Sequence, residues 1–361
     1  MMKPPSVLSF FSGLGFLDLG FESAGFTTKR INEYNPAFLE AYTFSRKKLG
    51  LPIPKDALEP ESIETLVSGK GLEKIKQAIE EERREGRLCG FIGGPPCPDF
   101  SVGGKNRGKA GDNGKLTGTY FELITKALPD WFLFENVKGL WRTKRHREFY
   151  DQMVKKAEKA GYVVRDRLSN SINYGAAQDR ERIIMIGFRE KLGKTLTEED
   201  WLKYMKHQPS EIKKIKWPEP SKFGARAKCP EEVPSELTVQ YWFEKNDVGN
   251  HPNANMGFKP KAGLKRFLEV QEGDDSRKSF KRLHRFRYSP TACYGNNEVH
   301  LHPTKARRIT VAEALAIQSA PKKFVLPNTM TLSAAFKTIG NGVPVMMAQG
   351  LANMIRAKLN E

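Results

Sequence analysis

The chain has 361 residues, of which 39% are hydrophobic and 28% charged, and these proportions exclude a disordered or membrane-embedded protein. Its length predicts about two domains. The formal net charge of +18 and the pI near 9.6 indicate a polyanionic partner, with nucleic acid as the first candidate and an anionic membrane surface as the second. A basic, solvated surface with no partner is the alternative.

The cysteines lie far apart and form no C-x-x-C pair, so neither a disulfide framework nor a structural zinc site is expected. They are Cys89, Cys97, Cys229 and Cys293. This usage is typical of a reducing cytoplasm. No stretch approaches the roughly 18 uninterrupted apolar residues of a membrane span. We therefore expect a soluble, intracellular protein.

In the first half of the chain, short apolar runs alternate with helical patterns, which predicts an α/β fold with a parallel, doubly wound sheet. The expected strands are 7–11, 28–32, 90–93, 131–135, 163–168 and 183–188. The expected helices are 17–24, 36–47, 72–84, 118–128 and 146–160. Ligands of such sheets bind at the carboxyl ends of the strands, so the residues that follow each strand are the first candidates for a site.

Residues 190–290 are rich in lysine, proline and glycine and show weak periodicity, which indicates a separate, irregular module. Helical periodicity returns at 310–318 and 344–359, where Thr310 and Glu313 are spaced as a capping box. We therefore predict a first domain over 1–189, a second over 190–290, and a return of residues 291–361 to the first domain.

A glycine turn, Phe11-Ser-Gly-Leu-Gly15, leads from the first strand into the first helix. Glycines let the backbone approach a ligand closely, and a helix N-terminus favours negative charge. Asp18 stands where the dinucleotide fingerprint has its third glycine, which argues against a nicotinamide cofactor. Glu33 and Tyr34 end the second strand, where they are suited to ribose hydroxyls and an adenine ring. The pattern favours a nucleoside cofactor over a plain tight turn with a solvated acid.

Cys97 follows a predicted strand and two prolines, in the segment Gly94-Pro-Pro-Cys97. The loop after it is rich in glycine and basic residues, among them Lys105 and Arg107, which would stabilise a thiolate and hold phosphate. This setting favours a nucleophile beneath a closing loop over a buried, inert thiol.

Two further motifs carry chemistry. Glu135 emerges from an apolar strand, so desolvation should raise its pKa and suit it to donate a proton; a helix-capping acid is the alternative. Gln178, Arg180 and Arg182 alternate on an extended segment and should point to one face. The two arginines predict a clamp for an anion or a carbonyl, or else a solvated edge strand.

Together these motifs resemble the DNA (cytosine-5-)-methyltransferase family of the prokaryotic restriction-modification type. Six segments carry the resemblance: Phe11–Gly15, Gly94–Cys97 with Ser101, Glu135-Asn-Val137, Gln178-x-Arg180-x-Arg182, Arg307-x-Ile-Thr310-x-x-Glu313 with Gln318 and Pro321, and Gly340-Asn341-Gly-Val343. Two positions depart from the family pattern: Pro98 replaces a glutamine and Ala177 replaces a proline.

The resemblance implies a Rossmann-like sheet that binds S-adenosylmethionine, with residues 190–290 as a smaller target-recognition domain. Cys97 would add to carbon 6 of a flipped-out cytosine, Glu135 would hold or protonate ring nitrogen 3, and Arg182, with Arg180, would polarise the base carbonyl. S-adenosylhomocysteine would be the product, and no metal would be needed. The implied cofactor residues are Phe11, Gly13, Gly15, Glu33, Tyr34, Asp56, Pro95, Asn341 and Val343. The implied DNA contacts are Ser101, Lys105, Arg107, Gln178, Lys281, Arg282, Arg285 and Arg287.

Duplex DNA is the expected substrate. The enzyme is expected to be monomeric, prokaryotic or phage-encoded, cytoplasmic and associated with the nucleoid when bound to DNA, with a cognate restriction endonuclease that acts separately. Three alternatives stay open. One is a methyltransferase of the same family that acts on transfer RNA. A second is a DNA-binding relative without catalysis, and a third is a nicotinamide or flavin oxidoreductase.

Overall fold

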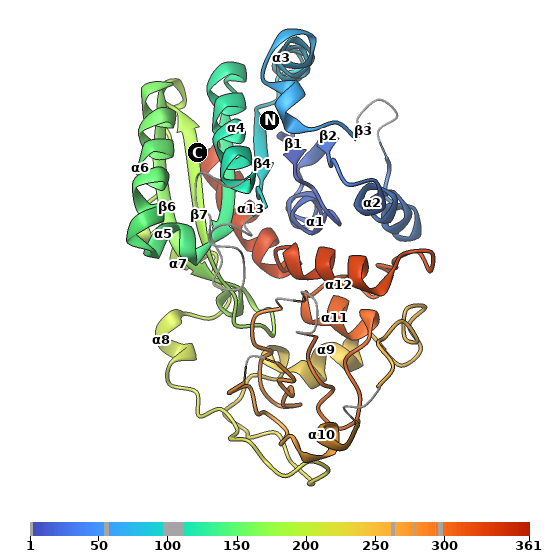
Figure 1. Cartoon of the computed structure of the whole chain (residues 1–361). Coiled ribbons are helices and arrows are strands. Elements are labelled where there is room, and N and C mark those ends of the chain that lie inside the picture. Colours follow the sequence, from blue (N-terminus) through green and yellow to red (C-terminus); the bar gives the residue numbers. More distant parts are fainter. Residues whose placement is uncertain are drawn as a thin grey trace.

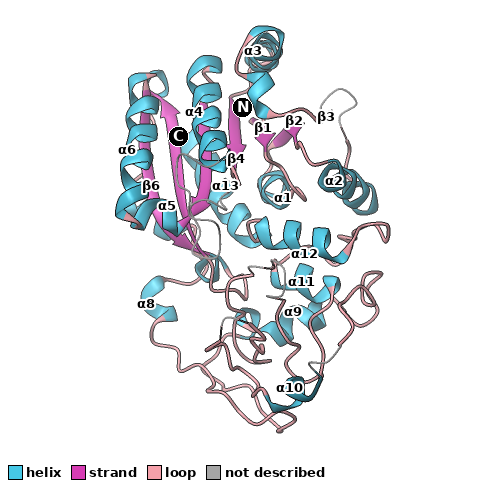
Figure 2. Cartoon of the chain, viewed as in Figure 1, coloured by secondary structure: helices cyan, strands magenta, loops and turns pink. Residues whose placement is uncertain are grey.

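The computed structural model describes residues 3–53, 58–96, 112–260, 264–277, 279–292, 294 and 299–361. The described chain forms two lobes. A sheet lobe carries helices on both faces of a β-sheet, and a small lobe (residues 209–317) consists mainly of loops and short helices (Figures 1 and 2). None of the described helices is long and apolar enough to cross a membrane.

The described part of the sheet lobe contains a seven-stranded sheet: β1 (Ser6–Phe10), β2 (Thr27–Asn32), β3 (Leu58–Glu59), β4 (Cys89–Gly93), β5 (Trp131–Val137), β6 (Tyr162–Asn170) and β7 (Glu181–Arg189). Its helices are α1 (Phe16–Ser23), α2 (Pro36–Leu49), α3 (Gly69–Arg84), α4 (Asp112–Ala127), α5 (Lys138–Arg142), α6 (Lys144–Lys159), α7 (Glu198–Lys203), α12 (Leu332–Asn341) and α13 (Val345–Asn360). The small lobe carries α8 (Pro209–Ile212), α9 (Val239–Lys245), α10 (Leu264–Glu269) and α11 (Val311–Ile317). Every strand and helix predicted for the first half is present, and most of their ends agree within a few residues.

The sheet has the order β3-β2-β1-β4-β5-β7-β6. The first five strands pair in parallel, but β7 is antiparallel to both β5 and β6. The prediction of a parallel sheet is therefore wrong at this edge. The reason is the connection, because residues 171–180 alone link β6 to β7, and a parallel crossover needs a dozen or more residues.

β1 lies where the strand order reverses. The chain runs from β1 outward to β3 and then returns to β4 on the other side of β1. Open α/β sheets bind ligands outside the carboxyl ends of the strands at such a point. The glycine turn after β1 and the segment after β4 both leave the sheet there.

Strand β5 shows why both faces of the sheet are covered. Successive side chains of a strand point to opposite faces. Phe132 and Phe134 pack in one apolar cluster with residues of α3, α4 and α6, whereas Trp131 and Leu133 pack in another with residues of α1 and α13. A strand that is apolar on both faces must be buried on both, and the two helical layers accomplish this (Figure 1).

The C-terminal helix completes the layer over β1. Val7 of β1 shares an apolar cluster with Met347 and Leu351 of α13. Helices α1 and α13 approach so closely that a Cβ atom on Gly20 would lie 2.3 Å from the Cβ atom of Ala348. This spacing leaves no room for a side chain at position 20.

The small lobe joins the sheet lobe through a shared apolar core. α11 begins with the predicted capping box, in which the Glu313 N–H donates to the Thr310 hydroxyl and the Thr310 N–H donates to the Glu313 carboxylate. Its residues pack with Trp242 of α9 and Phe336 of α12. The predicted second domain begins at residue 190, but Trp201 of α7 packs in the same apolar cluster as residues of α13, which belong to the sheet lobe. The predicted division into domains stays a prediction.

A buried charged cluster lies beneath the glycine turn. The Asp18 carboxyl is fully buried beside Tyr42, and Arg46 forms a two-pronged ion pair with Glu22, with both N–O distances at 2.9 Å. Burial raises the pKa of Asp18 from 3.8 to about 7, and a hydrogen bond from Ser9 opposes the effect. The cluster ties α2 to α1 directly behind the turn.

We predict that Gly20→Ala destabilises the protein by roughly 1–3 kcal/mol, because the added methyl group would force α1 away from the backbone of α13. Urea unfolding measures the change. Gly118 in α4 is the matched control: no atom lies within 4 Å of its Cβ position, so Gly118→Ala should leave the stability unchanged or raise it by about 0.5–1 kcal/mol. Equal stability of Gly20→Ala and wild type would contradict the close packing.

We predict that Asp18→Asn makes stability less dependent on pH. Because the pKa of Asp18 is raised to about 7, the folded state holds this proton more tightly than the unfolded chain, and the resulting stability is lost as the pH rises from about 4 to about 7. Relative to wild type, the variant should gain about 2–3 kcal/mol between pH 5 and pH 8, at 1.36 kcal/mol per pKa unit. Urea titrations at both pH values test this, and parallel pH dependences of the two proteins would refute it.

Candidate active site

The glycine turn after β1 has the backbone conformation that its sequence predicts. Gly13 and Gly15 both have positive φ angles, 54° and 77°. At Gly15 a Cβ atom would lie 2.4 Å from the Tyr42 ring, so only glycine fits there. Phe11 also has a positive φ, 55°, which is uncommon for a residue with a side chain. The turn therefore presents its backbone at the carboxyl edge of the sheet, at the start of α1.

Glu33 braces this turn from the end of β2. One carboxylate oxygen accepts the Gly13 N–H and the other accepts the Asn35 N–H, each at 2.8 Å. Burial raises the pKa of Glu33, and these two hydrogen bonds oppose the effect. The neighbouring Tyr34 is 71% exposed, although most large apolar side chains of the described chain are covered.

These residues fit a nucleoside cofactor. A carboxylate oxygen has two acceptor sites, so Glu33 can accept ribose hydroxyls in addition to its backbone donors. The exposed ring of Tyr34 offers a face for an adenine. Asn341 ends α12, and Val343 lies in the short connection to α13. Asp56 lies outside the described residues. Among the described residues, no cluster of histidine, cysteine and acidic side chains is placed to hold a metal ion.

Glu135 lies almost completely buried near the end of β5. Its carboxylate forms an ion pair with Arg182 of β7, with a distance of 2.9 Å between Oε1 and Nε. Burial raises the pKa of Glu135, while the positive charges of Arg182 and Arg180 act against that rise. The raised pKa agrees with the prediction from the apolar strand, but the ion pair with Arg182 was not predicted.

The two predicted catalytic motifs adjoin at this point. A Cβ atom on Gly94 would lie 2.6 Å from Oε2 of Glu135, so the glycine leaves space for the carboxylate. The buried Asn136 amide approaches the Pro95 carbonyl oxygen at 3.5 Å. Sequence reasoning gave no role of their own to Gly94 and Asn136, and their place inside the two motifs was the available signal. Cys97, Ser101, Lys105 and Arg107 lie outside the described residues.

Gln178 and Arg180 occupy the interior and not a surface. The Gln178 side chain accepts the Ala292 N–H at 3.0 Å and donates to Gln318 at 3.0 Å. Arg180 is 1% exposed and donates to the carbonyl oxygens of Ala292 and Gly340, at 3.2 and 2.8 Å. The predicted DNA contact at Gln178 is therefore not available in this structure. The two arginines of the predicted clamp have different partners: Arg182 pairs with Glu135, and Arg180 binds backbone carbonyls.

The basic run 281–287 is also divided by the fold. Arg282 is buried and donates to the carbonyl oxygens of Val270, Phe267, His302 and Lys305, which corrects its predicted role as a phosphate contact. The other three, Lys281, Arg285 and Arg287, stay partly exposed. Spacing alone cannot separate a buried arginine from an exposed one, because the carbonyls that bury it come from other segments.

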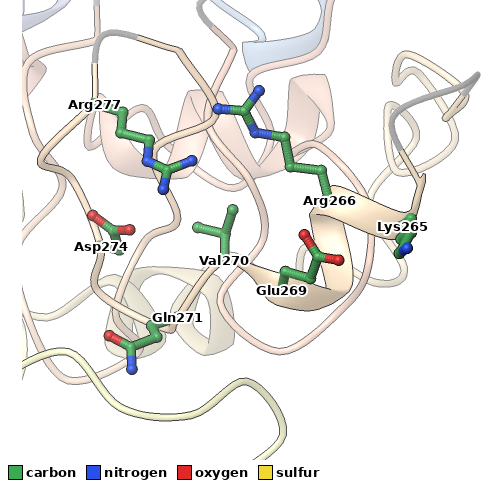
Figure 3. A pocket seen from close by; sticks show the side chains of 7 residues that line it. All are labelled: Lys265, Arg266, Glu269, Val270, Gln271, Asp274 and Arg277. Carbon is green, nitrogen blue, oxygen red and sulfur yellow. The ribbon is translucent and has the colours of Figure 1, made fainter.

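A hollow of about 650 Å³ opens beside α10 in the small lobe (Figure 3). Its lining combines cationic and acidic side chains, namely Lys265, Arg266, Arg277, Glu269 and Asp274, with Val270 and Gln271. In Figure 1, α10 lies at the end of the small lobe far from the sheet. The hollow is therefore separate from the predicted cofactor and catalytic residues.

Comparison with known proteins supports the resemblance that the motifs carry. The family described as C-5 cytosine-specific DNA methylase matches residues 6–357. The Type II methyltransferase M.NmeDI of Neisseria meningitidis serogroup C is 50% identical over 357 residues, which cover 99% of this chain and 84% of that protein. The Type II methyltransferase M.FnuDI of Fusobacterium nucleatum is 32% identical over 366 residues and covers 98% of this chain and 95% of its own length.

Solved structures share the fold. A putative DNA modification methyltransferase encoded within an Escherichia coli prophage superposes with a TM-score of 0.69 at 21% identity and covers 99% of this chain and 100% of its own. The Schizosaccharomyces pombe Dnmt2 methyltransferase superposes with a TM-score of 0.62 at 14% identity and covers 99% of each chain. The family match over nearly the full length, with a relative that is half identical, decides the assignment: the chain belongs to the C-5 cytosine-specific DNA methylase family and is an S-adenosylmethionine-dependent DNA cytosine-5 methyltransferase.

Proposed function

We propose that the enzyme methylates a flipped-out cytosine within a specific sequence of duplex DNA, through a covalent adduct of Cys97. The observation that supports this most directly is the position of Glu135. Its buried carboxylate adjoins Gly94, so the described residues 94–96, which precede Cys97 in the chain, leave the sheet next to the acid. A nucleophile and a proton donor that flank one base are the two groups that the reaction needs.

The chemistry explains why a thiol is required. Carbon 5 of cytosine is a weak nucleophile, so the ring must first be activated. The Cys97 thiolate forms a bond to carbon 6, and the electrons of the 5,6 double bond become available at carbon 5. When bound, S-adenosylmethionine would supply the methyl group to carbon 5, and S-adenosylhomocysteine would be its leaving group. Loss of the carbon 5 proton and cleavage of the bond between sulfur and carbon 6 then restore the ring and the thiolate.

Glu135 and Arg182 serve the same step. A carboxyl whose pKa is raised by burial can hold a proton for ring nitrogen 3 as negative charge develops on the base. Arg182 orients this carboxyl and limits the rise of its pKa. We propose that Arg182 also faces the base carbonyl, since its guanidinium has further donors beyond the one that Glu135 accepts.

DNA binding follows from the geometry of the base. A stacked cytosine is out of reach of Cys97, so the base must leave the duplex, at a cost of a few kcal/mol. We propose that Ser101, Lys105 and Arg107 contact the phosphates beside it, which offsets this cost. In the small lobe, Lys281, Arg285 and Arg287 stay partly exposed, which supports their role as contacts to the DNA phosphates; Arg285 also pairs with Glu272.

The biological setting is inferred from the relatives. M.NmeDI and M.FnuDI are both named Type II methyltransferases, which supports a modification enzyme whose partner restriction endonuclease acts separately. We propose a monomer in the cytoplasm of a prokaryotic or phage-infected cell. We also propose a reaction without a metal, because the thiolate and the carboxyl supply the activation.

Bisulfite sequencing of a plasmid from cells that express this chain tests the function. We expect complete methylation of one cytosine within one short recurring sequence, and Cys97→Ser should leave every cytosine unmodified. Purified wild type should also form a covalent adduct with duplex DNA that carries 5-fluorocytosine, and Cys97→Ser should not, although it should still bind S-adenosylmethionine. Activity on transfer RNA alone, or methylation by Cys97→Ser, would contradict the proposal.

We predict that Glu135→Gln lowers kcat by about 10²- to 10⁴-fold, the usual contribution of a positioned acid, and changes the Kd for S-adenosylmethionine little. Asp130 is the matched control, because it is a buried carboxylate paired with Arg83 at the opposite end of β5. Asp130→Asn should lower the stability without lowering kcat of the folded enzyme. Equal losses of kcat in both variants would assign the effect of Glu135 to folding.

A further inference from the structure

Three polar side chains form a buried hub between the two lobes. The hub consists of Gln178, Arg180 and Gln318, each of which is at most 1% exposed. Gln178 joins the hub to the small lobe, because its side-chain oxygen Oε1 accepts the Ala292 N–H. Its amide group donates to Gln318, which follows α11. The hub therefore connects segments that lie more than 100 residues apart.

The hub holds the end of α12. Gln318 donates to the carbonyl oxygens of Ile339 and Gly342, and Arg180 donates to those of Gly340 and Asn341. These are the last three carbonyls of α12 and that of its cap residue Gly342, at the helix end where carbonyls lack the regular intrahelical donor. The guanidinium also places positive charge at the negative end of the helix dipole.

Backbone hydrogen bonds and close packing also hold the segment after α12: the Gly342 N–H donates to the Ile339 carbonyl oxygen, and the Val345 N–H donates to that of Gln318. A Cβ atom on Gly342 would lie 2.4 Å from the ring of Phe16, the residue that follows the glycine turn. A Cβ atom on Gly340 would lie 3.0 Å from the carbonyl oxygen of Ala292. The two glycines contribute no side chains of their own, and the side-chain donors to carbonyls 339–342 in the described structure come from the hub.

We propose that Arg180 is a positioning residue for the cofactor and not a group that acts on the base. Asn341 is exposed, but its backbone carbonyl oxygen accepts a hydrogen bond from Arg180. The guanidinium therefore fixes the backbone of Asn341 and leaves the residue accessible to solvent. Through the same contacts Arg180 sets the place of Val343. The inference rests on the proposed cofactor role of Asn341 and Val343 and adds to it the side chains that orient them.

The test measures S-adenosylmethionine binding without DNA. Isothermal titration at a temperature well below unfolding gives the Kd for wild type, Arg180→Met, Arg180→Lys and Gln318→Met. We expect Arg180→Met and Gln318→Met to raise the Kd by about tenfold, because each removes hydrogen bonds that position the segment after α12. Arg180→Lys keeps a cationic donor and should recover part of the affinity.

Arg282→Met is the matched control. Arg282 is equally buried and also binds several backbone carbonyls, but these lie in the small lobe, away from α12. The control should lose stability and keep the Kd of wild type within about twofold. It thus separates a general loss of folding from a specific loss of the cofactor site.

The outcomes distinguish a positioning role of Arg180 from a direct role on the base and from a purely structural one. Arg180 variants that bind S-adenosylmethionine like wild type but have a reduced kcat would show a group that acts on the base, and would overturn the inference. If Arg282→Met weakened S-adenosylmethionine binding as much as Arg180→Met does, the hub would have a purely structural role, and the inference would again be overturned. If Arg180→Met does not fold, Arg180→Lys and Gln318→Met decide by the same criteria. A wild-type protein that binds no S-adenosylmethionine would instead overturn the proposed function itself.

Discussion

The burial of one carboxylate, Glu135, is the constraint around which this active site is arranged. A buried charge is costly unless it is paired, and Arg182 supplies the partner. Arg182 lies near the start of β7, and Glu135 lies near the end of β5. Only an antiparallel pairing brings these two positions to the same edge of the sheet, as the register of Val137 opposite Arg182 shows. The exception to the parallel sheet is therefore what completes the acid site.

The proposed cofactor site also depends on contacts between segments that are distant in the sequence. The glycine turn after β1 and Glu33 after β2 are close in sequence, and β1 and β2 pair directly. The third segment follows α12, near the end of the chain. It reaches the glycine turn because Gly342 has no side chain and so allows contact with the ring of Phe16. α13 then packs along α1 and holds this arrangement in place. The N-terminal and C-terminal parts of the chain thus meet beside the glycine turn.

The buried arginines show that a count of basic residues overestimates the number available to contact DNA. The net charge of +18 correctly indicates a polyanionic substrate, and the family assignment identifies it as DNA. Arg180 and Arg282 nevertheless donate to backbone carbonyls in the interior. Each guanidinium has five donors, which lets one side chain satisfy several carbonyls where irregular backbone is buried. The small lobe contains much irregular backbone, so part of its positive charge serves folding and not DNA.

The sequence by itself determined the features that depend on neighbouring residues. The apolar alternation of β5, the capping box at Thr310 and the position of Glu135 at a strand end are local patterns, and the structure contains all three. The motif order also identified the family. Only the tertiary structure decided the direction of β7 and the burial of Gln178, Arg180 and Arg282. Arg180 binds carbonyls 112 and 160 residues away, and local periodicity carries no information about such partners. A spacing of two residues places side chains on one face of a segment, but the rest of the chain determines what covers that face.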